Sequence, residues 1–177
     1  ALSGGVDSAV TALLLKKAGW NLTAVFMKNF DPQNWTTKNS LFNQQLMSSC
    51  SNVSDQKRAQ KVADFLGIPF CVLNYEAEYK KYVFDYFIRE YKKGNTPNPD
   101  VLCNTYIKFG ALLKFVQNIS PDGYLATGHY ARRSRANFEF KIENFTKDRH
   151  LLRGLDKSKD QSYFLWQLNQ DQLSRVI

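Results

Sequence analysis

The hydrophobic and polar positions at the start of the chain predict a helix followed by a strand. Residues 10–18 repeat apolar side chains at helical spacing, and Val10, Leu13, Leu14 and Ala18 lie on one face of the predicted helix. The next apolar run, Leu22–Met27, is short and rich in residues typical of a strand. The helix lies directly after a glycine-rich segment, an order typical of α/β folds.

The same alternation continues along the chain. The predicted elements are a helix at 59–66 that stops at a glycine, a strand at 70–73, a helix at 79–87, a helix at 105–116 and a strand at 123–127. This order predicts an α/β fold with a Rossmann-like parallel sheet and helices on both faces. Ligands in such folds lie beyond the carboxyl ends of the strands.

Two stretches depart from the alternation. Residues 29–52 are polar and rich in Asn, Gln, Ser and Thr, which predicts a long insertion. Residues 131–153 resemble a hairpin, with Phe138, Phe140 and Ile142 at alternating positions.

Composition limits the class of protein. With 177 residues, of which 44% are hydrophobic and 14% aromatic, the chain can bury one sizeable α/β core. No apolar run approaches the length of a membrane span, so no membrane partner is expected. Because Ala1 and Leu2 resemble the end of a strand, we expect the chain to be a fragment whose targeting peptide, if any, precedes it.

A net charge of +8 favours a polyanionic partner. Nine basic and four acidic residues lie between Arg132 and Lys159, so this stretch carries +5 of that charge. It is either a solvated basic face or a surface that contacts nucleic acid, with Tyr130 and Phe138 nearby as stacking groups.

The three cysteines form no C-x-x-C pair and no zinc spacing, so no protein metal site is predicted. Cys71 lies in an apolar strand and is expected in the core. Cys50 lies in the polar insertion. Cys103 follows a proline turn and precedes the helix that we expect at Thr105, where Asn104 or Thr105 would cap it. Two alternatives are open for Cys103: a thiolate that the helix dipole stabilises, or a buried thiol that does not react.

The most informative motif is SGGVDS at Ser3–Ser8. Glycines before a helix let backbone N–H groups surround an anion, and the helix dipole favours negative charge. The lysine of the Walker-type loop is absent. The motif resembles the PP-loop ATP pyrophosphatase family, which implies a grip on the pyrophosphate end of ATP. A glycine-rich turn without a ligand is the alternative.

Further motifs narrow the resemblance. In order they are SGGVDS, FMKN, TPNPDVLCN, IKF, ATGHYAR, LLRGLD and KDQSYFL. Together they resemble the tRNA-specific 2-thiouridylases over nearly the whole chain, and weaken in 31–49 and 134–149. The resemblance implies an adenine nucleotide alpha hydrolase-like domain over 1–130. A basic hairpin and helical extension at 131–177 would lead to further tRNA-binding domains.

The resemblance implies an activity and its participants. The uridine C2 oxygen would attack the α-phosphate of ATP, and sulfur from a persulfide would then displace AMP. ATP, with Mg²⁺, and tRNA are the implied cofactors and substrate, and a persulfide donor protein is the implied partner. Cys103 matches the first of two catalytic cysteines and would form a disulfide as sulfur is delivered. The second cysteine is expected beyond Ile177.

Three groups of residues follow from the same matches. The implied catalytic residues are Cys103, Asp100 as general acid or base, and Asp7, the two carboxylates being alternatively Mg²⁺ ligands. The implied ATP-binding residues are Ala1, Leu2, Ser3, Gly4, Gly5, Val6, Asp7, Ser8, Met27 and Gly128. The implied contacts to tRNA or its target base are Asn98, Pro99, Asp100, His129, Lys159, Asp160 and Gln161.

Alternatives remain open from the residues alone. His129 could be a structural histidine, and KDQS could be a helix start with Asp160 in its first turn. A PP-loop ligase or amidotransferase would share SGGVDS but has no use for TPNPDVLCN. An inactive nucleotide-binding module is a further rival, and an iron–sulfur thiolase is disfavoured because no C-x-x-C is present. The basic composition and the Asn-rich insertion favour a mitochondrial location.

Overall fold

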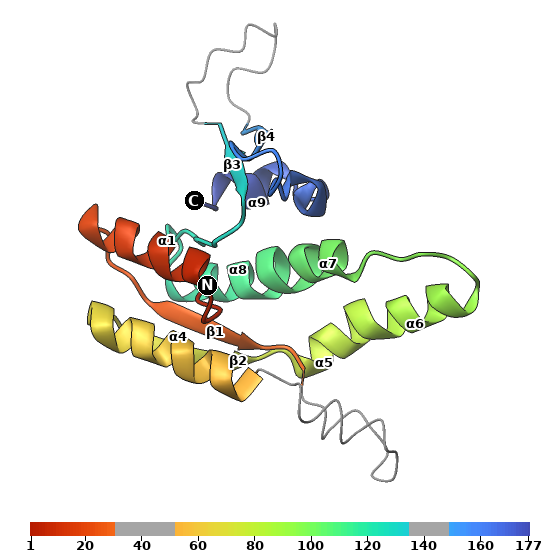
Figure 1. The fold of residues 1–177 in the computed structure, drawn as a ribbon, viewed down its shortest axis with the longest axis horizontal. Coiled ribbons are helices and arrows are strands. Elements are labelled where there is room, and N and C mark those ends of the chain that lie inside the picture. Colours follow the sequence, from red (N-terminus) through yellow and green to blue (C-terminus); the bar gives the residue numbers. More distant parts are fainter. Residues whose placement is uncertain (31–51, 135–148) are drawn as a thin grey trace, which may run out of the picture. The chain divides into compact units, whose positions relative to one another are not determined.

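A computed structural model describes residues 1–30, 52–134 and 149–177 (Figure 1). The chain divides into two compact units, 1–80 and 81–177, and each is described by itself. The boundary predicted at 130/131 is a different division and stays a prediction.

The first unit contains a parallel sheet. Strand β1 (Ala24–Lys28) pairs with β2 (Phe70–Asn74) in a register that places Ala24 opposite Phe70. The backbone N–H of Leu2 donates to the carbonyl of Val25 at 2.8 Å, so the first residues of the chain lie along β1. Both strands lie where the hydrophobic pattern predicts them, and the α/β class is confirmed.

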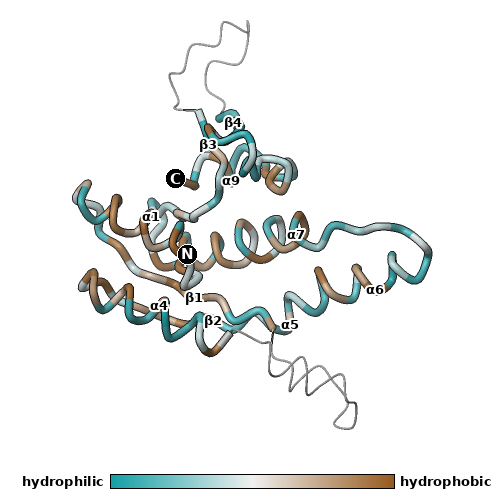
Figure 2. The backbone as a smooth tube through the Cα atoms, viewed as in Figure 1, coloured by the Kyte–Doolittle hydropathy of each residue, from teal (hydrophilic) through white to brown (hydrophobic). Residues whose placement is uncertain are grey.

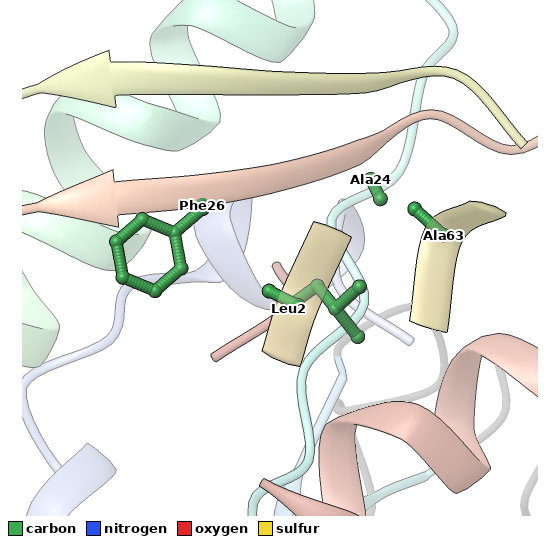
Figure 3. Packing of buried hydrophobic residues seen from close by; sticks show 5 residues of the cluster. Leu2, Ala24, Phe26 and Ala63 are labelled. Atoms are coloured by element: carbon green, nitrogen blue, oxygen red, sulfur yellow. The ribbon is translucent and has the colours of Figure 1, made fainter. Parts of the chain in front are cut away.

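Helix α4 (Asn52–Leu66) covers the sheet as predicted. Its residues Ala59 and Ala63 are fully buried against Leu2 and Phe26 in the core of the unit (Figure 3). The helix carries hydrophobic and hydrophilic residues in turn along its length (Figure 2), as expected for an amphipathic helix. It ends at Gly67, whose φ of 59° favours glycine.

Helix α1 (Val6–Lys17) is confirmed, but its predicted apolar face is only partly covered. Leu13 is half-buried, whereas Val10 is 45% and Leu14 59% exposed; Ala12 packs against the core cluster. Apolar residues lie on every side of this helix, so spacing alone could not select the buried face. Ala12 of α1 packs in the same core cluster as the alanines of α4. The prediction that helices cover both faces of the sheet therefore stays a prediction.

A helical run follows β2. Helix α5 (Glu76–Tyr79) leads into the π-helical turn η1 (Lys80–Phe84) and then α6 (Asp85–Lys92). The run ends before Gly94, which has a φ of 83°. This agrees with the helix predicted over 79–87.

The second helical run begins earlier than predicted. Helix α7 (Pro99–Leu102) continues directly into the π-helix η2 (Cys103–Leu112) and then α8 (Leu113–Ile119). Ile107 and Leu112 are fully buried and anchor η2 in the second unit. The loop that the sequence predicts over 95–104 is therefore wrong in its last six residues, 99–104.

The rest of the second unit is built from short elements. They are β3 (Ala131–Arg133), β4 (Leu151–Arg153), the 3-10 helix η3 (Ser162–Leu165) and α9 (Gln170–Ser174). Strands β3 and β4 pair antiparallel, which confirms the base of the hairpin, whereas Phe138, Phe140 and Ile142 lie outside the described residues.

The strand predicted over 123–127 is wrong. Only Leu125 pairs, in a single parallel bridge to Val176. A strand needs a neighbouring extended backbone to bond along its length, and Val176 offers that pairing at one position. Within the described residues, no helix is long and apolar enough to cross a membrane.

Candidate functional site

The glycine-rich motif forms a loop that is held together by two serines. The backbone N–H groups of Ser3 and Gly5 donate to Ser8 Oγ at 3.2 Å and to Ser3 Oγ at 3.3 Å, respectively. Ser8 Oγ donates to the Gly5 carbonyl at 3.0 Å, and the two serine hydroxyls are 3.1 Å apart. Since the one proton of Ser8 goes to Gly5, Ser3 must donate to Ser8. The buried Ser8 hydroxyl therefore fixes the loop and has no proton left for a ligand.

Gly4 gives the loop its bend. Its φ is 84°, and a Cβ there would collide with the carbonyl of Asp55 in the first turn of α4. Only glycine satisfies both conditions. A left-handed residue just before a helix directs successive amides to one side, and the first amides of α1 have no partner within the helix. Residues 3 and 5–7 are exposed, which suits the binding of an anion.

Asp7 and Met27 also belong to the first unit. Asp7 is exposed in the first turn of α1, where a carboxylate is favoured by the helix dipole. Met27 is half-buried near the carboxyl end of β1, the sheet edge where ligands of such folds lie.

In the second unit, Asn98 starts the helix that carries Asp100 and Cys103. Its side-chain oxygen accepts hydrogen bonds from the backbone N–H groups of Asp100 at 3.1 Å and Val101 at 3.3 Å. Pro99 occupies the first helical position, where a missing N–H costs nothing. The cap is thus Asn98, and the prediction of a cap at Asn104 or Thr105 is wrong.

This start changes the environment of Cys103. The residue lies after the first helical turn, and its N–H is bonded to carbonyls of that turn, so the thiol is not at an open helix N-terminus. Burial raises the pKa of the Cys103 thiol, with Asp100 adding to the rise and the Lys108 ammonium opposing it. Of the two alternatives left open for Cys103, the structure therefore favours the buried thiol over a thiolate favoured by the helix dipole.

His129 lies in a short chain of polar side chains. Its Nδ1 is 2.7 Å from Thr127 Oγ1, and its Nε2 is 3.4 Å from Lys108 Nζ. The Phe109 ring lies at a tilted angle, 5.7 Å from the imidazole centroid. Burial and then the Lys108 charge lower the pKa of His129 to about 4. Gly128 lies between Thr127 and His129 in the same extended stretch.

Two of the three KDQ residues, Asp160 and Gln161, bond the chain itself through their side chains. Asp160 accepts hydrogen bonds from the N–H groups of Gly154 and Ser162, both at 3.0 Å, and these bonds hold the pKa of Asp160 below its usual value. Gln161 and Tyr130 exchange two bonds, because the Tyr130 N–H donates to Gln161 Oε1 at 3.0 Å and the Gln161 N–H donates to the Tyr130 carbonyl at 2.9 Å.

Lys159 is the member of this segment that faces outward. It is exposed, and its ammonium lies 5.7 Å from the centre of the Tyr130 ring, within range of a cation–π contact. The alternative of a helix start is confirmed in part: the 3-10 helix η3 begins at Ser162, but Asp160 precedes its first turn and accepts a hydrogen bond from the Ser162 N–H.

Sequence reasoning missed the contacts that hold η2 in place. Asn104 Nδ2 donates to the Phe164 carbonyl at 3.1 Å, and Gln172 Nε2 donates to the Phe109 carbonyl at 2.8 Å. Thr105 Oγ1 lies 2.9 Å from Gln167 Oε1. These pairs join residues about sixty positions apart, so no local pattern could have identified them.

Exposed basic and aromatic residues lie close together in sequence near Lys159. Arg153 and Lys157 are exposed, while Tyr163 is 66% and Trp166 63% exposed. Charged side chains beside exposed rings suit a single-stranded nucleic acid, whose bases stack on aromatic faces.

The chain offers limited means to hold a metal. Among the described residues, no group of three or more His, Cys, Asp or Glu side chains could hold an ion. Cys71 and Cys103 are free thiols, and burial is the main cause of the raised pKa of each. Cys71 is half-buried rather than fully enclosed, and Cys50 lies outside the described residues.

The predicted residues thus form two sets. The first unit holds Ala1–Ser8 and Met27, and the second holds Asn98–Cys103, Gly128–His129 and Lys159–Gln161. The sequence motifs also predict that Cys103 lies within reach of a nucleotide bound at Ser3–Ser8; these residues belong to different units, and this stays a prediction.

Comparison with known proteins gives a consistent result. The family model described as "tRNA methyl transferase HUP domain" matches residues 1–177. Proteins named tRNA-specific 2-thiouridylase MnmA are 46% identical in Lactobacillus helveticus, 48% in Lactiplantibacillus plantarum and 47% in Streptococcus equi subsp. zooepidemicus. Each alignment covers 99% of this chain and 42% of the relative. The chain therefore spans less than half the length of these curated relatives.

Proposed function

The chain belongs to the tRNA methyl transferase HUP domain family, and on this basis we propose that it forms the ATP-binding part of an enzyme that replaces the C2 oxygen of a tRNA uridine with sulfur. The observation that carries the proposal is the capped helix at TPNPDVLCN, which fixes a carboxylate and a thiol one turn apart. The curated relatives are named 2-thiouridylases. The family description mentions methyl transfer, but a thiol at this position favours sulfur chemistry.

The first step would use the loop of the first unit. The amides at Gly4 and Val6 would bind the β- and γ-phosphates, while the uridine O2 attacks the α-phosphorus and the bond to pyrophosphate breaks. The product is an O2-adenylated uridine. AMP is a far better leaving group than oxide, which is the chemical reason for using ATP.

A magnesium ion fits these residues as a companion of the nucleotide. Mg²⁺ in such sites is held by one or two carboxylates together with substrate phosphates, and Asp7 provides one carboxylate beside the loop. When bound, the ion would neutralise phosphate charge. Asp7 would help to hold it there.

The second step would use Cys103. Its thiolate would attack the inner sulfur of a cysteine persulfide, forming a disulfide and breaking the sulfur–sulfur bond of the persulfide. The released sulfide would attack C2 of the uridine, and AMP would leave with its oxygen. The persulfide comes from a donor protein, and the cysteine that carries it would lie outside this chain.

The second unit would supply the contacts to tRNA. Asn98 and Asp100 would face the target base, with Asp100 as the general acid or base. Exposed Lys159 and Lys157 would contact phosphates, while Trp166 offers a stacking surface for an unpaired base. Asp160 and Gln161, whose polar atoms bond the chain itself, would act by holding this segment in shape.

An ATP-dependent ligase is the competing function, because it would share the phosphate loop. It does not require a cysteine at position 103. The side chain of Cys103 therefore separates the two proposals.

The decisive experiment is Cys103→Ser in the full-length protein. We expect thiouridine formation, measured by mass spectrometry of digested tRNA, to fall below detection, while tRNA-dependent release of pyrophosphate from ATP continues. Cys71→Ser is the matched control and should retain thiolation. Undiminished thiolation by Cys103→Ser would refute the assigned role, and pyrophosphate release that needs no tRNA would favour the ligase.

A further inference from the structure

The polar chain at His129 has a definite arrangement of protons. An ammonium group can only donate, so His129 Nε2, 3.4 Å from Lys108 Nζ, must be the acceptor. The imidazole proton then lies on Nδ1, which donates to Thr127 Oγ1 at 2.7 Å. A pKa lowered to about 4 agrees with a neutral ring at physiological pH. His129 is therefore a fixed acceptor that holds the Lys108 ammonium.

The π-helix decides where Lys108 lies relative to Cys103. The two residues are the first and the sixth of η2. In a π-helix the backbone hydrogen bond joins positions five apart, so such residues follow one another along the helix. In an α-helix, with 3.6 residues per turn, the same pair would point to different sides. Cys103 and Lys108 accordingly interact electrostatically.

Two opposing influences act on the thiol. Burial and the Asp100 carboxylate both disfavour its charged form, while Lys108 favours it. Asp100 and Lys108 are the charged side chains that act on Cys103, and His129 acts on Lys108 rather than on the sulfur directly. The net result is a raised pKa, so the resting group is the thiol, and Lys108 is the influence that favours its ionisation.

We propose that Lys108 stabilises the Cys103 thiolate for the sulfur-transfer step, and that His129 and Thr127 are positioning residues that hold its ammonium in place. This deepens the proposed function and rests on it. In the step described above, Cys103 must carry a full negative charge when it attacks the persulfide sulfur, because the thiolate is the nucleophile. The ammonium would offset that charge until the new sulfur–sulfur bond has formed.

The test measures the thiol directly and needs neither ATP nor tRNA. Full-length protein is alkylated with iodoacetamide between pH 6 and 10, and the rate at Cys103 is read from its peptide by mass spectrometry. We expect Lys108→Met to slow Cys103 alkylation at pH 7.5 about tenfold, corresponding to a pKa about one unit higher. Lys108→Arg, which keeps the charge, should restore most of the rate.

Two controls make the result specific. Lys114→Met removes an exposed lysine from α8 and should leave the Cys103 profile unchanged. Cys71, in the same molecules, should react at the wild-type rate in every folded variant. If Lys108→Met exposes both cysteines by unfolding the protein, Lys108→Gln, which still donates to His129, decides instead. An unchanged profile for the folded uncharged variant overturns the proposal.

The outcome separates this inference from the proposed function. A shifted profile together with full thiolation by Cys103→Ser would leave Lys108 acting on the thiol but remove the thiolation role of both. An unshifted profile together with lost thiolation by Cys103→Ser would leave the function standing and reject the role of Lys108.

Discussion

At the scale of single residues, a side chain that belongs to a binding motif need not contact the ligand itself. Ser8 closes the SGGVDS motif, yet its hydroxyl accepts from Ser3, donates to Gly5 and is buried. The hydrogen bonds of Ser8 Oγ hold the loop in shape, and backbone amides at the start of α1 are the groups that can bind an anion. Asp160 and Gln161 show the same division, since their polar atoms bond the chain itself while Lys159 faces solvent.

His129 gives a prediction about stability and pH. Its pKa in the folded protein, about 4, lies below the unfolded value of about 6.5, so the unfolded state binds the proton more readily. The contribution of His129 to stability is complete above pH 6.5 and is lost as pH falls toward 4. Between pH 7.5 and pH 4.5 the free energy of unfolding should fall in both proteins. We expect this fall to be about 2 kcal/mol smaller in His129→Gln than in the wild type.

Urea unfolding at the two pH values measures this difference. Glutamine keeps an acceptor for Lys108 but does not titrate, so the comparison cancels the carboxylates that both proteins share. A parallel loss of stability in the two proteins would contradict a neutral, buried imidazole at position 129.

At the scale of elements, η2 depends on a glycine. A Cβ at Gly110 would stand 2.8 Å from the carbonyl oxygen of Thr105, five residues earlier, which is closer than side chains allow. The wide turn of a π-helix brings these atoms together. Elsewhere in a helix, replacing glycine by alanine stabilises by about 1 kcal/mol.

We therefore expect Gly110→Ala to destabilise the protein by about 1–3 kcal/mol and to slow alkylation of Cys103 in the folded form, because Lys108 moves out of position. Gly123→Ala is the matched control: its Cβ would stand 2.9 Å from the Ser120 carbonyl, outside η2. It should lose stability without changing Cys103. Thermal unfolding and peptide-resolved alkylation measure both effects, and a stabilised Gly110→Ala would exclude the crowding.

The elements show what the sequence could reveal. Helix α4 and both strands of the first unit were predictable because their apolar positions follow a single period. The start at Asn98 was also within reach, since a capping residue followed by proline is a known helix signal. The pairing of Cys103 with Lys108 was not, because it requires a π-helix, and α-helical spacing places those residues on different sides.

At the scale of the whole molecule, the net charge of +8 favours binding of a polyanion. The described residues include exposed basic side chains that could form the binding surface. Exposed Arg153 and Lys157 lie near the exposed ring of Trp166 in sequence. Motif resemblance was sufficient to predict the family, whereas the arrangement of the two sets of site residues and the mitochondrial location stay predictions.

Salt dependence of tRNA binding tests this surface. Replacing Arg153 and Lys157 together by Ala should reduce the slope of log Kd against log salt by about 1.5–2, since each lost phosphate contact removes a released counterion. Trp166→Ala should weaken binding by about 1–3 kcal/mol at every salt concentration without changing the slope.

Filter binding between 50 and 300 mM salt, with full-length protein, provides the measurement. Lys92→Ala with Lys114→Ala removes two exposed lysines from other helices and serves as the control. A slope that stays at the wild-type value in the Arg153 and Lys157 variant would show that phosphates bind elsewhere.

The two hydrogen bonds between Gln161 and Tyr130 have one more consequence. They fasten the Lys159 segment to the stretch that follows His129 before any nucleic acid arrives. Recognition by a preorganised segment loses little conformational entropy on association, so more of the contact energy appears as affinity. If the segment binds RNA as proposed, loosening these two bonds would therefore weaken the binding.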